Sequence, residues 1–112
     1  MKVTIILPIR NEKHFIEKTL KSITDQKFDG ELEIIISDGL SNDGTLDIIK
    51  KFQKKYGYIK LIRNNAKIVP IGFNKALSFA KGDIIIRVDG HSTIGPDFIN
   101  NSIKILNEKN AS

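Results

Sequence analysis

The sequence predicts one α/β domain in which helices cover both faces of a mostly parallel sheet. Short runs of branched apolar residues alternate with segments of helical apolar spacing along the whole chain. The 112 residues, of which 40% are hydrophobic, suffice for one compact core but not for two. Strands that alternate with helices in this way are joined by right-handed crossovers into a parallel sheet. We therefore expect a three-layer α/β/α sandwich.

Two strands and two helices are expected in the first half of the chain. The strands are runs of branched apolar side chains at residues 3–7 and 32–37, as in strands that are buried on both faces. The first helix is expected at residues 14–25, where apolar side chains recur at helical spacing. The second is expected at residues 45–56, where Asp43 is placed to cap the first turn.

The same alternation continues in the second half of the chain. Strands are expected at residues 59–62 and 84–88, and the latter is the most apolar run. Between them we expect a long loop that holds Pro70 and Gly72, and then a helix over residues 73–81. A last helix begins near Pro96, and its apolar face consists of Ile99, Ile103 and Leu106.

The composition excludes several classes of protein. The chain has no cysteine, which excludes a disulfide framework, a thiolate metal site and a cysteine nucleophile and favours a reducing cytosol. No apolar run approaches the ~20 residues that a membrane-spanning helix needs, and the amino terminus lacks a signal-peptide pattern. These features predict a cytoplasmic protein.

The net charge of +5 and the pI near 9.5 suggest nucleic-acid binding at first. However, the lysines are dispersed along the expected helix faces, which is typical of solvation, so we expect no nucleic-acid partner. The positive charge still favours an anionic substrate, or peripheral association with anionic headgroups at the inner face of a membrane.

Polar or turn-forming residues follow three of the four expected strands. Ligands of open parallel sheets bind beyond the carboxyl ends of the strands, so these residues form the candidate site. They are Pro8, Arg10, Asn11 and Glu12 after the first strand, residues 38–45 after the second, and Asp89, Gly90 and His91 after the fourth.

Common nucleotide-binding motifs are absent from this sequence. No Gly-x-Gly-x-x-Gly follows the first strand, and there is no Gly-x-x-x-x-Gly-Lys-Ser/Thr loop. A receiver domain is also disfavoured, because Arg63 and Asn64 end the third strand where the phospho-acceptor aspartate is expected.

Four segments resemble the amino-terminal half of the family 2 glycosyltransferases, which have the Rossmann-like GT-A fold. Residues 38–45 read Asp-Gly-Leu-Ser-Asn-Asp-Gly-Thr and are similar, position for position, to the family's Asp-Asp-Gly-Ser-Thr-Asp-Gly-Thr. The other segments are residues 3–12, residues 72–77, and residues 81–89, which lead to the family's metal-binding Asp-x-Asp motif. Here that motif reads Asp-Gly-His, as in exopolysaccharide branches of the succinoglycan type. Singly each match is weak, but their order and spacing make a strong signal.

The resemblance implies a nucleoside pocket. In the family, the first aspartate of the Asp-Asp-Gly-Ser segment accepts a hydrogen bond from the imide of uracil, and Asp38 stands at that position. The turn after the first strand packs against the base, which assigns Pro8, Arg10 and Glu12 to the pocket. Arg10 replaces the more usual tyrosine, although a guanidinium plane can also stack on a base. The alternative for Asp38 is a turn former that satisfies its own backbone.

The resemblance also implies a divalent cation, Mn²⁺ or Mg²⁺, that bridges the diphosphate of the donor. Asp89 and His91 stand where the family has its two aspartates, and an imidazole suits manganese better than magnesium. Gly90 allows a tight bend near phosphate oxygens. The alternative for His91 is a turn cap. Lys67 and Asn74, near the start of the third helix, are further candidates for phosphate binding, with a structural role equally open.

The implied activity is inverting transfer of a sugar from a nucleotide diphosphate sugar, such as a UDP-sugar, to a saccharide or lipid-linked acceptor hydroxyl in cell-surface polysaccharide synthesis. In the family, the general base comes from a second, acceptor-binding half. We therefore expect residues 1–112 to be a single, truncated donor-binding domain without that half, and no catalytic base in this chain. An exposed sheet edge would favour a homodimer. The alternative function is a non-catalytic nucleotide-binding or assembly module.

Overall fold

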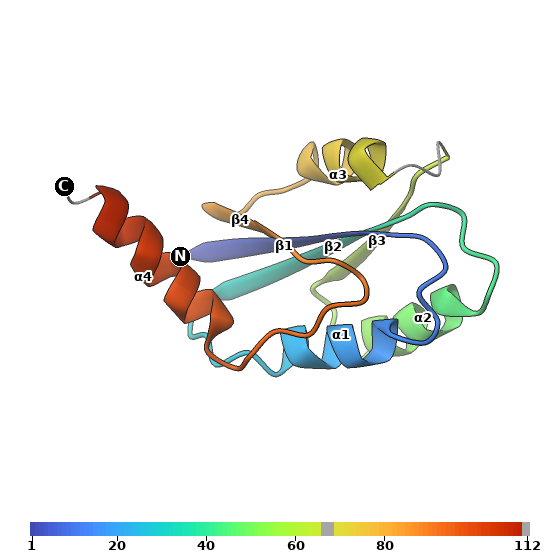
Figure 1. Ribbon diagram of the computed structural model, residues 1–112, viewed down its shortest axis with the longest axis horizontal. Coiled ribbons are helices and arrows are strands. Elements are labelled where there is room, and N and C mark those ends of the chain that lie inside the picture. The colour runs from blue at the N-terminus through green and yellow to red at the C-terminus, as the bar shows by residue number, and fades with distance from the viewer. Residues whose placement is uncertain (66–68, 111–112) are drawn as a thin grey trace.

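The computed structural model describes residues 1–65 and 69–110. They form a parallel sheet with helices on both faces. Strands and helices alternate strictly along the described chain, as the sequence predicts (Figure 1). In order they are β1 (Lys2–Ile9), α1 (Ile16–Thr24), β2 (Glu31–Asp38), α2 (Thr45–Lys55), β3 (Ile59–Arg63), α3 (Val69–Leu77), β4 (Ile84–Arg87) and α4 (Phe98–Asn110).

The four strands lie in the order β3-β2-β1-β4 and all pairs are parallel. Ile5 of β1 is level with Ile34 of β2 on one side and with Ile86 of β4 on the other. The first two strands of the chain, β1 and β2, therefore form the centre of the sheet. On its two sides β1 is flanked by β2 and β4, whose following loops carry candidate site residues. The predicted α/β class is confirmed.

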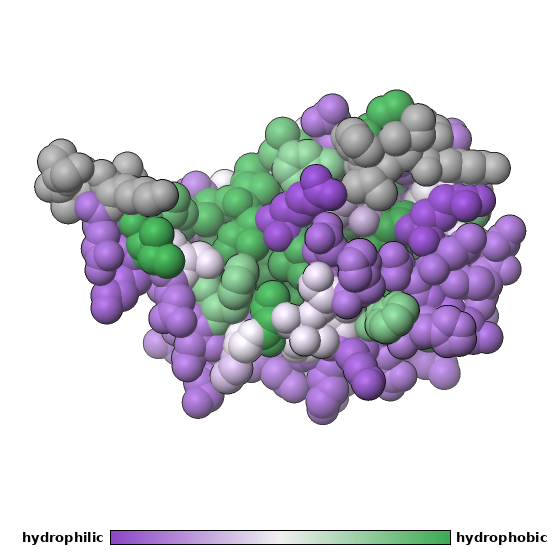
Figure 2. All heavy atoms as spheres, viewed as in Figure 1, coloured by the Kyte–Doolittle hydropathy of each residue, from purple (hydrophilic) through white to green (hydrophobic). Residues whose placement is uncertain are grey.

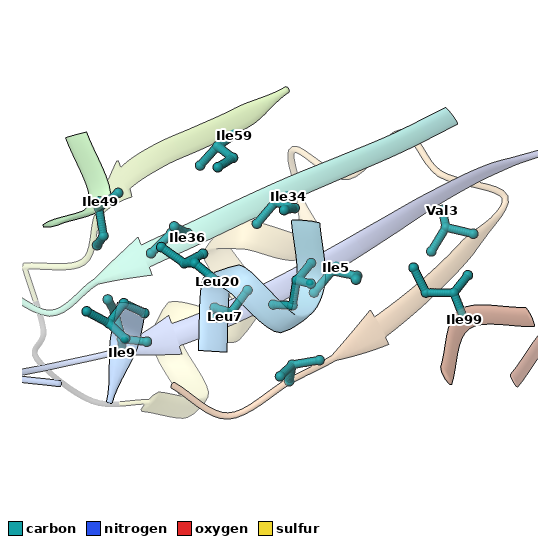
Figure 3. Close-up of a cluster of buried hydrophobic side chains, with 13 residues drawn as sticks. Val3, Ile5, Leu7, Ile9, Leu20, Ile34, Ile36, Ile49, Ile59 and Ile99 are labelled. Atoms are coloured by element: carbon teal, nitrogen blue, oxygen red, sulfur yellow. The ribbon is translucent and has the colours of Figure 1, made fainter. Parts of the chain in front are cut away.

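Successive residues of β1 face opposite layers, because side chains alternate across a strand. The odd-numbered positions, from Val3 to Ile9, join the main core with α1, α2 and the buried Ile99 of α4 (Figure 3). Ile6 instead packs with Ala76 of α3 in a smaller core on the other face. Figure 1 shows the corresponding layers, with α1 and α2 on one side of the sheet and α3 on the other.

The third helix differs from the sequence-based expectation, which placed Pro70 and Gly72 in a loop. Both residues lie inside α3, which begins at Val69 and ends at Leu77. Proline is tolerated in the first turn of a helix because the amide there has no intrahelical partner. At Gly72 a Cβ atom would lie 2.8 Å from Nδ2 of Asn64 and 3.0 Å from Oγ of Ser37. Glycine is therefore needed because α3 approaches the sheet so closely.

A buried carboxylate, Glu33 of β2, ties the amino-terminal ends of the strands to the loop before β4. Its side chain accepts hydrogen bonds from the hydroxyl of Thr4 (2.8 Å), the ammonium of Lys60 (2.9 Å) and the backbone amide of Lys81 (3.0 Å). Burial alone would raise the pKa of Glu33, but these hydrogen bonds and the charge of Lys60 outweigh it. They lower the pKa from 4.5 to about 2.

The last helix and the outer strand leave apolar surface uncovered in the described residues. Figure 2 shows apolar side chains gathered over β4, between α3 and α4. None of the helices within residues 1–65 and 69–110 combines the length and apolar character needed to cross a membrane. The exposed large apolar residues of α3, β4 and α4 are Ile71, Leu77, Ile85, Phe98, Ile105 and Leu106.

Candidate functional site

The loops after β1, β2 and β4 leave the same end of the sheet. Ile9, the last residue of β1, is level with Asp38, the last residue of β2. On the other side of β1, Ile6 is level with Arg87, two residues before Asp89. Since neighbouring strands are ~4.8 Å apart, β2 and β4 flank β1 at a separation of roughly 10 Å.

Hydrogen bonds join the loop after β1 to the loop after β2. Nε of Arg10 donates to the carbonyl oxygen of Gly39 at 2.9 Å, and the amide of Asn11 donates to the hydroxyl oxygen of Ser41 at 2.8 Å. The side-chain oxygen of Asn11 accepts in return from the amide of Asn42 at 2.9 Å. The two loops therefore behave as one unit at the rim of the sheet.

Two non-glycine residues in these loops adopt left-handed backbone angles. Asn11 has φ of 52° and Leu40 has φ of 60°. Asparagine tolerates this conformation well, whereas for leucine the Cβ atom is crowded by the backbone. Such strain persists only where the surroundings enforce it, and here the network between the two loops does so.

Asp38 is almost fully buried, with 1% of its surface exposed, and it holds the turn that follows β2. Its Oδ2 accepts from the amide of Ser41 at 2.9 Å, and its Oδ1 accepts from the hydroxyl of Ser41. This is the turn-forming role that the sequence left open as an alternative. A contact between Asp38 and a base stays a prediction.

Asp43 supports the start of α2, although the residue at the N-cap position is Gly44, with φ of 99°. Oδ1 of Asp43 accepts from the amide of Thr45 at 3.0 Å and from the Thr45 hydroxyl. Burial raises the pKa of Asp43, but the hydrogen bonds from Thr45 and from the amide of Lys13 outweigh this and lower it. Asp43 is thus a structural anion rather than a free ligand.

A cleft of about 260 Å³ opens between the loops after β1 and β4. Its lining includes six of the predicted site residues, which come from segments some 80 positions apart in the sequence. It is lined by Pro8, Ile9, Arg10, Glu12, Arg87, Asp89, Gly90 and His91.

The buried Gly90 brings the turn after β4 against β1. A Cβ atom there would lie 2.5 Å from Cγ2 of Ile9 and 3.0 Å from Cγ of Glu12. Only glycine therefore allows Asp89 and His91 to stand this close to the loop after β1. This close approach fits the bend predicted at Gly90, whereas its contact with phosphate stays a prediction.

Two pairs of basic and acidic side chains line the cleft, and one of them links its two sides. Nδ1 of His91 lies 3.6 Å from Oε1 of Glu12, which links the loops after β4 and β1. Nη2 of Arg87 lies 3.6 Å from Oδ1 of Asp89. The guanidinium of Arg87 also lies over the ring of Phe73 in α3, at 5.6 Å from its centroid. The side chains of Asp89 and His91 remain 53% and 61% exposed, so both are accessible to a ligand.

The donor atoms present suit a divalent cation that is shared with its ligand. The described residues contain no cluster of three or more histidine and acidic side chains able to hold a metal by themselves. Asp89 and His91 supply one carboxylate and one imidazole, a set compatible with Mn²⁺. Cations of this kind are commonly held by one or two protein groups and completed by substrate phosphates and water. The residues therefore fit a cation that binds together with a diphosphate.

Two other predicted site residues, Asp38 and Asn74, do not line the cleft. Asn74 is exposed on α3, next to the ring that contacts Arg87. Lys67 lies outside the described residues. Arg87 was not predicted, although it ends β4 only two residues before Asp89, and it lines the same cleft.

Another hollow, of about 310 Å³, lies between α1 and α2. It is lined by residues of these two helices together with Asp25 and Tyr56, which directly follow them, and its apolar lining includes Phe52. None of its residues follows a strand, so it is separate from the rim where the candidate residues meet.

Solved structures with this architecture are glycosyltransferases of the GT-A fold. Over 96% of this chain, Staphylococcus aureus TarS 1-349 superposes with a TM-score of 0.86 and 27% sequence identity; the chain covers 33% of that structure. A mannosyltransferase from Pyrobaculum calidifontis, solved with GDP-Man and Mn²⁺, gives a TM-score of 0.85 at 27% identity. The chain is covered to 91% in that comparison and covers 31% of the mannosyltransferase. The fold therefore defines a GT-A glycosyltransferase domain.

Residues 4–112 match the family Glycosyl transferase family 2, and the chain belongs to this family. A curated relative from Methanococcus voltae is 37% identical over 105 residues, which are 91% of this chain. That relative is a dolichyl N-acetyl-α-D-glucosaminyl phosphate 3-β-D-2,3-diacetamido-2,3-dideoxy-β-D-glucuronosyltransferase. The chain spans 33% of the length of that relative.

Proposed function

We propose that residues 1–112 are the donor-binding part of an inverting glycosyltransferase and bind a nucleotide diphosphate sugar in the cleft between the loops after β1 and β4. The observation that carries this proposal is the cleft itself, which Arg10, Asp89 and His91 line together at the carboxyl end of the sheet. The acceptor pocket and the general base would lie in a further part of the enzyme.

Each charge in the cleft has a role in this proposal. Asp89 and His91 would hold Mn²⁺ in preference to Mg²⁺. The cation would neutralise the negative charge on the departing diphosphate. Arg87 would contact the diphosphate oxygens, for which a planar guanidinium is well shaped. Pro8 and Arg10 would lie beneath the base, and Glu12 would fix the His91 ring.

Ligands of the structural neighbours support this class of donor. TarS has also been solved with UDP-GlcNAc, and that structure matches this chain with a TM-score of 0.80 and 26% identity. The Pyrobaculum enzyme binds GDP-Man together with Mn²⁺. We therefore infer a nucleoside diphosphate sugar as donor. We favour UDP-sugars because Asp38 stands at the position predicted, from the family pattern, to contact uracil. A saccharide or a lipid-linked sugar is the acceptor we infer.

Isothermal titration calorimetry with UDP, with and without Mn²⁺, tests the proposal. We expect binding that depends on Mn²⁺ and weakens by at least about 10-fold in Asp89→Asn, because one lost charge-assisted contact costs roughly 1.5–3 kcal/mol. Asp29→Asn, at an exposed loop position outside the cleft, is the matched control and should bind as the wild type does. Equal affinity of both variants would place the nucleotide elsewhere. The absence of binding by any nucleotide would favour the alternative, a non-catalytic assembly module.

We also infer peripheral association with the cytoplasmic face of a membrane. The net charge of +5 and the dolichyl-linked substrate named for the Methanococcus relative support this placement. Co-sedimentation with vesicles that contain an anionic phospholipid, compared with neutral vesicles, tests it. Retention on neither kind of vesicle would contradict the inference.

A further inference from the structure

Thr19, on α1, is a fully buried polar residue that contacts the turn after β4. Its hydroxyl donates a hydrogen bond to the carbonyl oxygen of Gly90 at 3.1 Å, across 71 positions of sequence. The Gly90 carbonyl belongs to the peptide between Gly90 and His91, so this bond holds the backbone between the two candidate cation ligands, Asp89 and His91. The cleft itself does not include Thr19, which lies behind the turn.

Ser22 of α1 and Gln26, which lies just beyond the end of that helix, tether the segment that follows this turn. The amide of Ile94 donates to the hydroxyl oxygen of Ser22 at 3.2 Å. The amide of Ile99 donates to Oε1 of Gln26 at 3.0 Å. Thr19, Ser22 and Gln26 thus contact, in turn, the chain from Gly90 to the start of α4. Of these contacts, the one made by Thr19 is nearest to the cleft.

The direction of the Gly90 carbonyl determines the orientation of the neighbouring residues Asp89 and His91. Gly90 has no side chain to restrict its backbone, and the permissive backbone of glycine allows several orientations of the adjacent peptides. A buried carbonyl without a partner is unfavourable, so a donor at a fixed position selects one orientation. The close approach of Gly90 to Ile9 and Glu12 fixes the distance between the turn and β1. The hydrogen bond from the Thr19 hydroxyl fixes the direction of the Gly90 carbonyl.

We propose that Thr19 is a positioning residue for the proposed donor site: its hydroxyl fixes the Asp89-Gly90-His91 turn so that both side chains face the cleft. The role in ligand binding rests on the proposed function. The role in ordering the turn does not, because it is a property of the protein without ligand.

The decisive comparison is between Thr19→Val and Thr19→Ser. Valine keeps the shape and loses the donor, whereas serine keeps the donor and loses a methyl group. We expect Thr19→Val to weaken Mn²⁺-dependent UDP binding roughly 3- to 10-fold, as for the loss of one hydrogen bond, while Thr19→Ser binds as the wild type does. The control is Thr24→Val, on the same helix, whose hydroxyl donates to Leu20 and Lys21 of α1 itself.

Amide hydrogen exchange gives a readout that needs no ligand. The amide of Ser92 donates to the carbonyl oxygen of Asp89 at 3.1 Å and therefore reports the order of the turn. We expect faster exchange at Ser92 in Thr19→Val and unchanged exchange in Thr19→Ser and Thr24→Val. If Thr19→Val does not fold, Thr19→Ala replaces it, because alanine and serine differ by the hydroxyl oxygen alone.

Each outcome decides one of the two proposals. Equal exchange in Thr19→Val and the wild type would overturn the positioning role, and so would equal losses in the valine and serine variants, which would indicate packing by the methyl group. If the wild type binds no UDP, the proposed function fails, and the exchange rates still decide whether Thr19 orders the turn.

Discussion

Leu40 is the residue whose backbone fits its side chain least well, because it adopts φ of 60° in the loop after β2. The family pattern has glycine at this position. A left-handed conformation costs an L-residue roughly 1–2 kcal/mol, which exceeds the usual entropic disadvantage of glycine. We expect Leu40→Gly to be more stable than Leu40→Ala by about 1 kcal/mol in urea denaturation. The opposite order, which is normal elsewhere in proteins, would show that the loop is not strained.

Glu33 makes stability depend on pH. Its pKa is lowered from 4.5 to about 2 in the folded protein, so its contribution is complete above pH 4.5 and is lost as the pH falls toward 2. The wild type should lose about 2 kcal/mol from this group alone between neutral pH and pH 3. Urea denaturation of the wild type and of Glu33→Gln at several pH values gives the free energy of unfolding of each protein as a function of pH. The wild type should lose more of this free energy at low pH than Glu33→Gln does, and parallel pH dependences would refute the prediction.

At the residue scale, one general rule of sheets accounts for Arg10 and Asp89, which line one cleft because the carboxyl ends of parallel strands share one edge. The same rule also predicts Asp38 in the site, but Asp38 is buried, bonded to Ser41 and outside the cleft lining. Thr19 was not predicted, since a threonine between core residues of a helix shows no sign of a partner 71 positions away. Its role depends on where the chain returns after β4, which local spacing does not specify.

At the scale of elements, α3 shows how packing overrides local signals. Proline and glycine are the strongest breakers in a sequence, so Pro70 and Gly72 predict a loop. In the structure, α3 includes both because the helix lies close to β1 and β2. A close approach between elements is a tertiary property, and this explains why the start of α3 could not be read from the sequence while the strands could.

A substitution at Gly72 tests that approach. A methyl group there would lie 2.8 Å from Nδ2 of Asn64, which should cost about 1–3 kcal/mol although alanine favours a helix. Gly57→Ala is the control, since a Cβ atom at Gly57 meets nothing within 4 Å. Guanidinium denaturation should show a large loss for Gly72→Ala and almost none for Gly57→Ala. Similar values for both would mean that α3 does not pack so tightly.

At the scale of the whole molecule, the outer edge of β4 predicts self-association. Among the described strands β4 pairs only with β1, and Ile85 is 42% exposed. Open edges and apolar surface favour pairing between copies. Antiparallel pairing centred on Ile85 would place Asp83 of each copy opposite Arg87 of the other, so the edge is complementary to itself.

Sedimentation velocity over a range of protein concentrations measures this association. We expect a reversible dimer that Ile85→Lys converts to a monomer, because a charge on the paired face is disfavoured. Phe15→Lys, at an exposed apolar position outside β4, should leave the dimer intact. A wild type that is monomeric at every concentration would exclude pairing through this edge.

The contacts between Arg10 and Gly39 and between Asn11 and Ser41 hold the rim of the sheet through the protein's own atoms. A nucleotide that binds as proposed would therefore meet loops whose dihedral angles are already set, and little chain entropy would be lost on binding. More of the energy of each new contact then remains as affinity. A small domain gains from such rigidity because it makes few contacts with a ligand, so that each misplaced contact would remove a large share of the affinity.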